Sequence, residues 1–285
     1  MSNISIFAKR AFRNVDHGQA FEPSHARTGH LLRVSSMIRA DQIVERLGAR
    51  LNPTTCYHDD VCIYVKPHVK PGEDFKFEGR AYLDIVDGWD LVPLAQANPQ
   101  VGVIACSDQD GALLRRTLPN PVTVIPQHHC NFDRAIHGGW ARNRVGVIGT
   151  REAFKHLPAG LEDEIRARGM LLECYSRFFT RQDVVDFYQR IDVQIVWRPY
   201  SMHLSNPLKI VNAAAFGVPT IALYESVFDE VRDCYVPVNG LVELLAALEL
   251  FRSLPGMCAD YERQCLVRAE RYHIDNVAEM YRSLN

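Results

Sequence analysis

Short runs of consecutive apolar residues alternate along the chain with longer segments in which apolar residues recur every three or four positions. The runs include ISIFA, VCIYV, VGVIAC and VTVI in the first half and RVGVIG, MLLECY, DVQIVW and PTIALY in the second. Runs of this length, bounded by polar residues, are typical of buried strands. Strands that alternate with helical segments predict parallel sheets covered by helices.

The pattern predicts two successive α/β series of similar size. We expect strands at 4–8, 61–67, 81–88, 101–107, 122–126, 144–150, 170–175, 192–199 and 219–224. We expect helices at 31–51, 108–118, 152–169, 182–190 and 208–216 and through most of the chain after Gly240. The predicted fold is α/β, with two Rossmann-like lobes, 1–135 and 143–270, and a cleft between them. Ligands of such folds bind at the carboxyl ends of the strands.

The amino-acid composition limits the classes of protein to which the chain can belong. The 285 residues are 47% hydrophobic and carry a net charge of −2, so the chain as a whole has no electrostatic attraction for nucleic acid or anionic membranes. No apolar run approaches the roughly 20 residues of a membrane span. The eight cysteines form no C-x-x-C pair, which favours reduced thiols over disulfides or structural zinc. We therefore predict a cytoplasmic protein.

The segment SNPLKIVNAAAFGVPTIALYES, residues 205–226, predicts a phosphate site. Ser205 or Asn206 can cap a helix whose first turn holds Pro207, and the free N–H groups at such an end attract anions. Lys209 in that first turn opposes the helix dipole unless an anion is bound nearby. A solvated surface lysine on an ordinary core helix is the alternative.

The same segment carries a resemblance to a known family. NPLKIVNAAAFGVPTIA resembles the donor-site helix of the GT-B glycosyltransferases, in particular the retaining group often called GT4-like, and RVGVIGT resembles the strand that opens their second lobe. The resemblance implies transfer of a sugar from a nucleoside-diphosphate sugar, a UDP- or GDP-sugar, without a catalytic metal and with retention. It also implies that the last helix, 271–285, crosses back to the first lobe.

Donor-binding residues follow from this resemblance. Lys209 would contact the donor diphosphate, and Asn212 stands where the family has a glutamate that contacts the ribose. The family's second glutamate corresponds to Leu204, so its paired-glutamate signature is absent. Gly149 and Thr150, at the end of the strand 144–150, can let a phosphate approach the backbone or form an ordinary tight turn. Arg198, after the strand QIVW, is expected in the cleft.

The first lobe is expected to bind the acceptor. Asp16 and His17 in the long loop after the first strand are candidate general bases or positioning groups, as is His128 at the junction of the lobes. Arg27 and Gly29 are candidate acceptor-binding residues. The acceptor itself is not identified by the sequence: a carbohydrate or small molecule is favoured, and a modified nucleic-acid base remains open because the segment 9–33 is basic.

Two segments of the sequence could suggest a metal site. Asp108-x-Asp110 resembles the metal-binding aspartate pair of GT-A glycosyltransferases, but Ser107 and Asp108 occupy a predicted helix start. The His128-His129-Cys130 run lacks any standard zinc spacing. We expect no metal. A sugar-nucleotide epimerase and a non-catalytic binding protein of the same fold remain alternatives, and the absent glutamates favour the latter.

Overall fold

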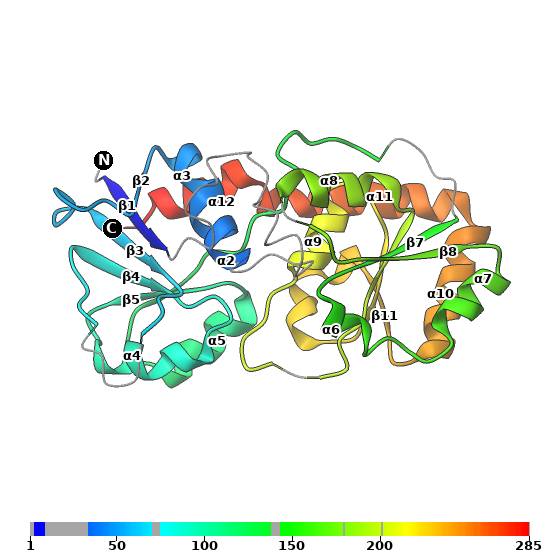
Figure 1. The fold of residues 1–285 in the computed structure, drawn as a ribbon, viewed down its shortest axis with the longest axis horizontal. Helices are drawn as coiled ribbons and strands as arrows, with labels where there is room; N and C mark the ends of the chain where they lie inside the picture. The colour runs from blue at the N-terminus through cyan, green and yellow to red at the C-terminus, as the bar shows by residue number, and fades with distance from the viewer. Residues whose placement is uncertain are drawn as a thin grey trace.

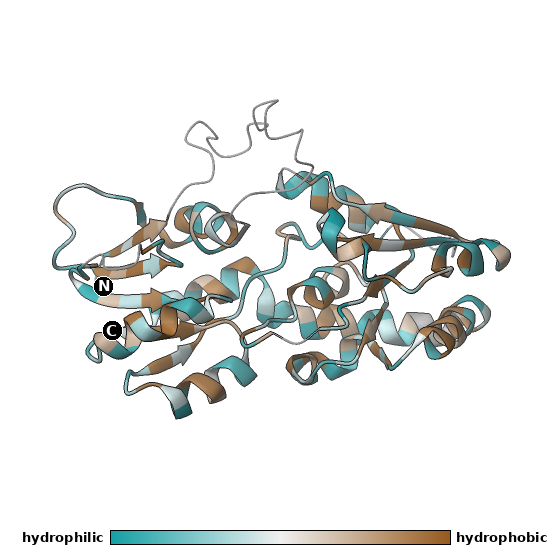
Figure 2. Ribbon diagram, turned by 60° about the horizontal axis from the view of Figure 1, so that its bottom comes forward, coloured by the Kyte–Doolittle hydropathy of each residue, from teal (hydrophilic) through white to brown (hydrophobic). Residues whose placement is uncertain are grey.

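A computed structural model describes residues 3–8, 34–69, 75–137, 143–178, 180–200 and 202–284. They form two α/β lobes that lie side by side, each built on a parallel sheet (Figure 1). The predicted fold class is therefore confirmed. In the view coloured by hydropathy, apolar segments run through both sheets (Figure 2). Every residue of β3 (Val61–Val65), β5 (Gly102–Ala105) and β9 (Val193–Val196) is buried, as expected for strands covered on both faces.

The first lobe is built on a sheet of six described strands in the order β2-β1-β3-β4-β5-β6. Its other strands are β1 (Ile4–Ala8), β2 (Arg50–Leu51), β4 (Arg80–Asp84) and β6 (Val122–Val124). Its helical segments are α2 (Val34–Ser36), the π-helical η1 (Met37–Asp41), α3 (Gln42–Leu47), the 3₁₀ segment η2 (Trp89–Leu91), α4 (Val92–Ala97) and α5 (Asp108–Thr117).

The second lobe is built on a sheet of five described strands in the order β11-β10-β9-β7-β8. Its other strands are β7 (Arg144–Ile148), β8 (Leu171–Tyr175), β10 (Thr220–Leu223) and β11 (Val236–Val238). Its helical segments are α6 (Arg151–Phe154), α7 (Leu161–Ala167), α8 (Arg181–Arg190), α9 (Leu208–Ala214), the 3₁₀ segment η3 (Ser226–Cys234), α10 (Leu241–Ser253) and α11 (Pro255–Ala269).

The chain returns to the first lobe at its end. After α11, the 3₁₀ segment η4 (Glu270–Tyr272) leads into α12 (Ile274–Arg282), which lies beside α3 (Figure 1). Ile274, Val277 and Tyr281 belong to the same buried cluster as residues of β1 and β3. The final helix therefore completes the core of the first lobe, although the residue limits of the lobes given above stay predictions.

Two predicted helices are wrong in their extent. The helix expected at 31–51 ends at Leu47, because Gly48 takes a positive φ of 63°, and residues 50–51 instead pair with β1 as a short strand. The helix expected at 152–169 is two helices, α6 and α7. Pro158 and Gly160, the latter with φ of 75°, lie between them and interrupt the helical pattern.

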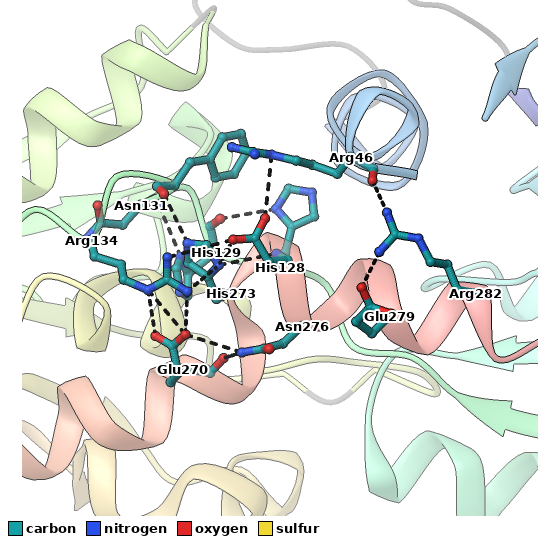
Figure 3. A network of polar contacts seen from close by, with 12 residues as sticks. Arg46, His128, His129, Asn131, Arg134, Glu270, His273, Asn276, Glu279 and Arg282 are labelled. Carbon is teal, nitrogen blue, oxygen red and sulfur yellow. Dashed lines mark hydrogen bonds and ion pairs between the residues drawn. The ribbon is translucent and has the colours of Figure 1, made fainter. Parts of the chain in front are cut away.

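The chain passes between the lobes twice, through residues 125–137 (the first crossing) and through η4 into α12 (the second crossing), and polar contacts tie the two crossings to each other. Arg134 of the first crossing donates to Glu270 at 2.6 Å and contacts His273 at 3.1 Å, and the ring of His273 also contacts the Phe132 carbonyl at 3.1 Å. Figure 3 shows this polar network, in which Arg134, Glu270 and His273 converge from the two crossings. Asn131 donates to the Ala215 carbonyl at 2.7 Å and so fixes the crossing to the second lobe.

A buried ion pair fixes the π-helical segment η1 in the first lobe. Arg39, which is 1% exposed, donates to Asp84 at 2.7 Å and to the carbonyls of Ile125 and Pro126. The hydroxyl of Tyr281 on α12 donates to the same carboxylate at 3.1 Å. One guanidinium thus joins η1 to the carboxyl ends of β4 and β6, which face the cleft.

Candidate functional site

A cavity of about 350 Å³ lies between the lobes. Residues of η1 and α3 and the first crossing line it on one side, and the strand ends β7 and β9 with helices α8 and α9 line the other. Five of the predicted donor-binding residues and one predicted catalytic residue meet here: Gly149, Thr150, Arg198, Lys209, Asn212 and His128. The fold has thus brought together residues from widely separated parts of the sequence.

The Lys209 side chain is accessible to solvent, and it lines the cavity together with residues of both lobes. Its ammonium forms no ion pair or hydrogen bond with any residue that the structure describes. The surrounding protein disfavours the charged form, and the cation of Arg198 adds repulsion that Glu225 only partly offsets. The pKa of Lys209 is lowered to about 8. An unpaired cation in a cleft is a favourable partner for an anionic ligand.

Arg198 lies beside Lys209 and is held in place by its own partners. Its guanidinium donates to both oxygens of Glu225 and, at 2.5 Å, to the hydroxyl of Ser205. Because the Glu225 carboxylate already neutralises Arg198, Lys209 supplies the uncompensated charge. Glu225 lies two residues beyond the end of β10, and the sequence did not single it out.

The start of α9 differs from the prediction. Pro207 is the N-cap residue, not the first helical residue, and no side chain caps the helix in the predicted manner. Asn206 instead accepts a hydrogen bond from the Leu208 N–H at 3.1 Å, while the Ser205 N–H donates to Asp110. Since α9 spans only seven residues, its dipole is weak and the side-chain cations carry most of the attraction for a phosphate.

Gly149 allows Lys209 to lie against the end of β7. A Cβ atom at this glycine would stand 3.3 Å from the Lys209 Nζ and 3.4 Å from the Ala153 Cβ. Thr150 follows as the N-cap of α6, where its hydroxyl accepts from the Ala153 N–H at 3.4 Å. Both residues line the cavity, so an approaching anion meets backbone and hydroxyl groups next to the ammonium.

Asn212, in the position of the family's glutamate, links α9 to the first crossing. Its side-chain oxygen accepts from the Cys130 N–H at 2.8 Å, and its side chain also interacts with the hydroxyl of Tyr188. The amide therefore has a structural partner even though it lines the cavity. Its contact with a ribose stays a prediction.

His128 is buried at the other wall of the cavity. Its Nε2 lies 2.9 Å from the Ile38 carbonyl oxygen and its Nδ1 lies 3.2 Å from that of His129. Burial lowers the pKa of His128 to about 4, so the ring is neutral at physiological pH. A neutral ring donates from one nitrogen only, and the Ile38 carbonyl is the nearer acceptor. A catalytic role for His128 stays a prediction.

The remaining predicted residues are placed as follows. Asp16, His17, Arg27 and Gly29 lie outside the described residues. Of the aspartates weighed as a metal pair, Asp108 is paired with Arg271 and Asp110 accepts from Ser205. Burial raises the pKa of Asp110 to about 7. Within the described ranges, no group of three or more His, Cys, Asp or Glu side chains is arranged to hold a metal ion.

Two further findings concern the surface and thiols of the described part of the chain. None of its helices has the length and apolar character needed to cross a membrane. The seven cysteines whose side chains are described are all free thiols, and five of them are buried: Cys62, Cys106, Cys130, Cys234 and Cys265.

Sequence comparison finds no matching protein-family model and no similar curated protein. Structure comparison does find similar folds. HepE from Anabaena, solved with UDP and glucose, matches over 100% of both chains with a TM-score of 0.56 and 11% identity. WaaG, a glycosyltransferase involved in lipopolysaccharide biosynthesis, matches over 97% of both chains with a TM-score of 0.52 and 9% identity.

TarM also matches, with a TM-score of 0.54 and 10% identity over 79% of this chain. This chain covers 54% of TarM and 57% of a chain in the GtfA/B complex, so it spans little more than half the length of those proteins. At such low identities the similarity concerns the fold. The chain has the GT-B glycosyltransferase fold, as its resemblance in sequence implied.

Proposed function

We propose that the protein is a glycosyltransferase that moves a sugar from a nucleoside-diphosphate sugar to an acceptor hydroxyl. The observation that carries this proposal is the Lys209 ammonium, which has no ion-pair or hydrogen-bond partner among the described residues and lies in the cleft of a GT-B fold, beside Arg198 and opposite Gly149. A diphosphate placed there would meet one free cation and one fixed cation. HepE, a similar fold that was solved with UDP and glucose, makes UDP-glucose the first donor to try.

In such a reaction, Lys209 and Arg198 would stabilise the leaving diphosphate. The bond between the sugar carbon and the diphosphate oxygen breaks, and its electron pair goes to the diphosphate. The acceptor oxygen bonds to the same carbon, and the acceptor proton is released. Negative charge on the leaving diphosphate grows during this step, so fixed cations nearby stabilise the transition state more than the ground state. We propose that they do so without a catalytic metal.

Retention at the sugar carbon is proposed on the resemblance alone. A carbohydrate or small molecule is the proposed acceptor class, and a cytoplasmic location is proposed because the thiols are free and mostly buried. Lys209 and Gly149 would bind donor in a non-catalytic relative as well, so nucleotide binding alone does not establish turnover.

The first test is thermal stabilisation by UDP, GDP, ADP, dTDP and CDP, each in EDTA and again with magnesium. We expect one nucleotide, UDP or GDP, to raise the melting temperature in EDTA, since ligand binding to the folded state stabilises it. Stabilisation only with magnesium would contradict metal independence. No shift with any nucleotide would reject the donor site, and binding without turnover of any sugar donor would leave a non-catalytic binding protein.

Nucleotide affinity is expected to fall above pH 8. Lys209 titrates at about 8 in the free protein, and a bound diphosphate raises its pKa, so the complex holds more protons than the free components. The dissociation constant should rise by no more than about twofold from pH 7 to 8 and then by up to about tenfold per pH unit above. Terminal phosphates titrate near 6 and do not interfere.

Calorimetry at pH 9 in buffers of different ionisation enthalpy measures this linkage directly. Uptake of up to about one proton per bound nucleotide is expected in the parent and none in Lys209→Met. Proton release, or equal uptake in the variant, would show that another group is responsible.

A further inference from the structure

The segment 202–205, part of the connection from β9 to α9 in the second lobe, is anchored in the core of the first lobe. Leu204 is 1% exposed and belongs to a buried cluster whose other members all come from the first lobe, among them Leu83, Leu91 and Leu114. Burial of this leucine removes apolar surface from water, so the contact favours the docked position of the segment.

A buried carboxylate and a stacked ring hold the same segment. Asp110 in the first turn of α5 is 2% exposed, and both of its oxygens accept from the Ser205 N–H, at 3.0 and 3.1 Å. The indole of Trp89 in η2 stacks on the ring of His203, with the ring centroids 4.8 Å apart. Three consecutive residues of the second lobe, His203, Leu204 and Ser205, therefore each contact the first lobe.

The docked segment supplies two of the partners of Arg198. The guanidinium donates to the hydroxyl of Ser205 at 2.5 Å and to the sulfur of Met202 at 3.0 Å, while Glu225 accepts from its Nε at 2.9 Å. Partners at fixed positions reduce the side-chain entropy that an arginine loses when it binds an anion. The first lobe thus determines, through this segment, where the charge of Arg198 lies.

Arg198 and Lys209 stand where two cavities meet. The second cavity, of about 420 Å³, shares Arg198, Leu208 and Lys209 with the cavity of about 350 Å³. The docked segment lines it from the second lobe, and Lys66 and Asp87, whose side chains form an ion pair of 2.5 Å, line it from the first. A shift of the segment would therefore move Arg198 relative to Lys209 at the proposed diphosphate position.

The burial of Leu204 also gives a physical reason for a departure from the family pattern. Leu204 is the residue to which the second glutamate of the paired signature corresponds. A carboxylate at this position would lie among apolar side chains of the first-lobe core, where burial without a partner is costly. A leucine at this position therefore suits a segment that docks in the first lobe.

We propose that the segment 202–205 is an inter-lobe clamp that positions Arg198 for the donor diphosphate, with Leu204 as its anchor and Asp110 as a positioning residue. Neither Leu204 nor Asp110 lines the cavity of about 350 Å³, so both act through Ser205 and Arg198. The proposal rests on the proposed function, because it assigns Arg198 to the donor. It makes the first lobe responsible for the geometry of a phosphate site built from second-lobe residues.

Titration calorimetry with UDP and with GDP tests the clamp. Asp110→Ala and Leu204→Ala should each lower the affinity for the nucleotide that binds by about three- to tenfold. Asp110→Asn and Leu204→Met should retain most of the affinity, because an amide oxygen still accepts from the Ser205 N–H and a methionine fills a similar volume. In the Arg198→Met background, Asp110→Ala should have no further effect, since the side chain that Asp110 positions is gone.

Two matched controls separate positioning from loss of stability. Leu118, in the same buried cluster, lies at the opposite end of α5 from Asp110, so Leu118→Ala should lower the melting temperature and leave nucleotide affinity unchanged. Asp59→Ala should change neither quantity, because Asp59 is an exposed carboxylate of the first lobe that lines neither cavity.

The outcomes distinguish the clamp from the function on which it rests. Parental affinity in both Asp110→Ala and Leu204→Ala, an equal loss in Leu118→Ala, or an undiminished effect of Asp110→Ala in the Arg198→Met background would overturn the clamp. Absence of binding of either nucleotide by the parent would instead reject the proposed function, and the clamp with it.

Discussion

Lys209→Ala is expected to weaken nucleoside-diphosphate binding by about 10- to 150-fold, which corresponds to the roughly 1.5–3 kcal/mol of a charged hydrogen bond. Sugar transfer should fall further, by about two to three orders of magnitude, because the lost charge acts most strongly on the leaving diphosphate. The ammonium has no partner among the described residues, so its removal leaves no buried group unpaired. The melting temperature of the free protein should therefore change little.

Titration calorimetry with UDP or GDP and initial rates with the sugar donor measure the two effects. Lys155→Ala is the matched control, since Lys155 is an exposed lysine of the same lobe, paired with Glu152 and outside both cavities. A Lys209→Ala protein that binds and turns over like the parent would rule out the assignment of Lys209 to the diphosphate.

Arg39→Met should destabilise the first lobe by about 3–5 kcal/mol, the cost of leaving one partner of a buried ion pair alone. Asp84 has 0% exposure and would lose its cation, while the carbonyls of Ile125 and Pro126 would lose a donor. The effect should extend to the site, because Met37 and Ile38 beside Arg39 line the donor cavity. Urea denaturation followed by far-UV circular dichroism measures the loss.

Two variants separate the ion pair from general damage to η1. Arg39→Met combined with Asp84→Leu should recover much of the stability, since no unpaired charge remains. Arg46→Met should cost less than about 1 kcal/mol, because Arg46 is half exposed and its pair with Asp275 spans 3.7 Å. A loss below about 1 kcal/mol in Arg39→Met would show that Asp84 finds another partner.

The apolar runs located most of the sheet residues but not every element. β11 and the 3₁₀ segment η3 were not predicted, and residues 50–51 were assigned to a helix although they extend the first sheet. These are short elements whose pairing is decided by partners far away in sequence. A local apolar pattern indicates that a segment is buried, but it does not indicate which strand pairs with that segment.

The sequence likewise singled out some residues of the site and not others. Lys209, Arg198 and Gly149 were singled out because each stands at the end of a strand or opens a helix at the carboxyl edge of the sheet, and their contact with a donor stays a prediction. Lys66 and Asp87 lie near the ends of the predicted strands 61–67 and 81–88, so the same rule could have identified them. Asp110 was weighed only as a metal ligand, because its contact with the Ser205 backbone joins residues 95 positions apart.

The sequence by itself determined the two α/β series, the placement of a lysine after an Asn-Pro-Leu turn and the resemblance to the GT-B fold. Only the tertiary structure decided that Lys209 forms no ion pair with a described residue while Arg198 pairs with Glu225, that Asn212 is hydrogen-bonded to Cys130, and that two cavities meet at one ammonium. The physical reason is the range of the interactions. Burial and turn preferences act on neighbouring residues, whereas charge pairing and cavity shape depend on how the two lobes pack.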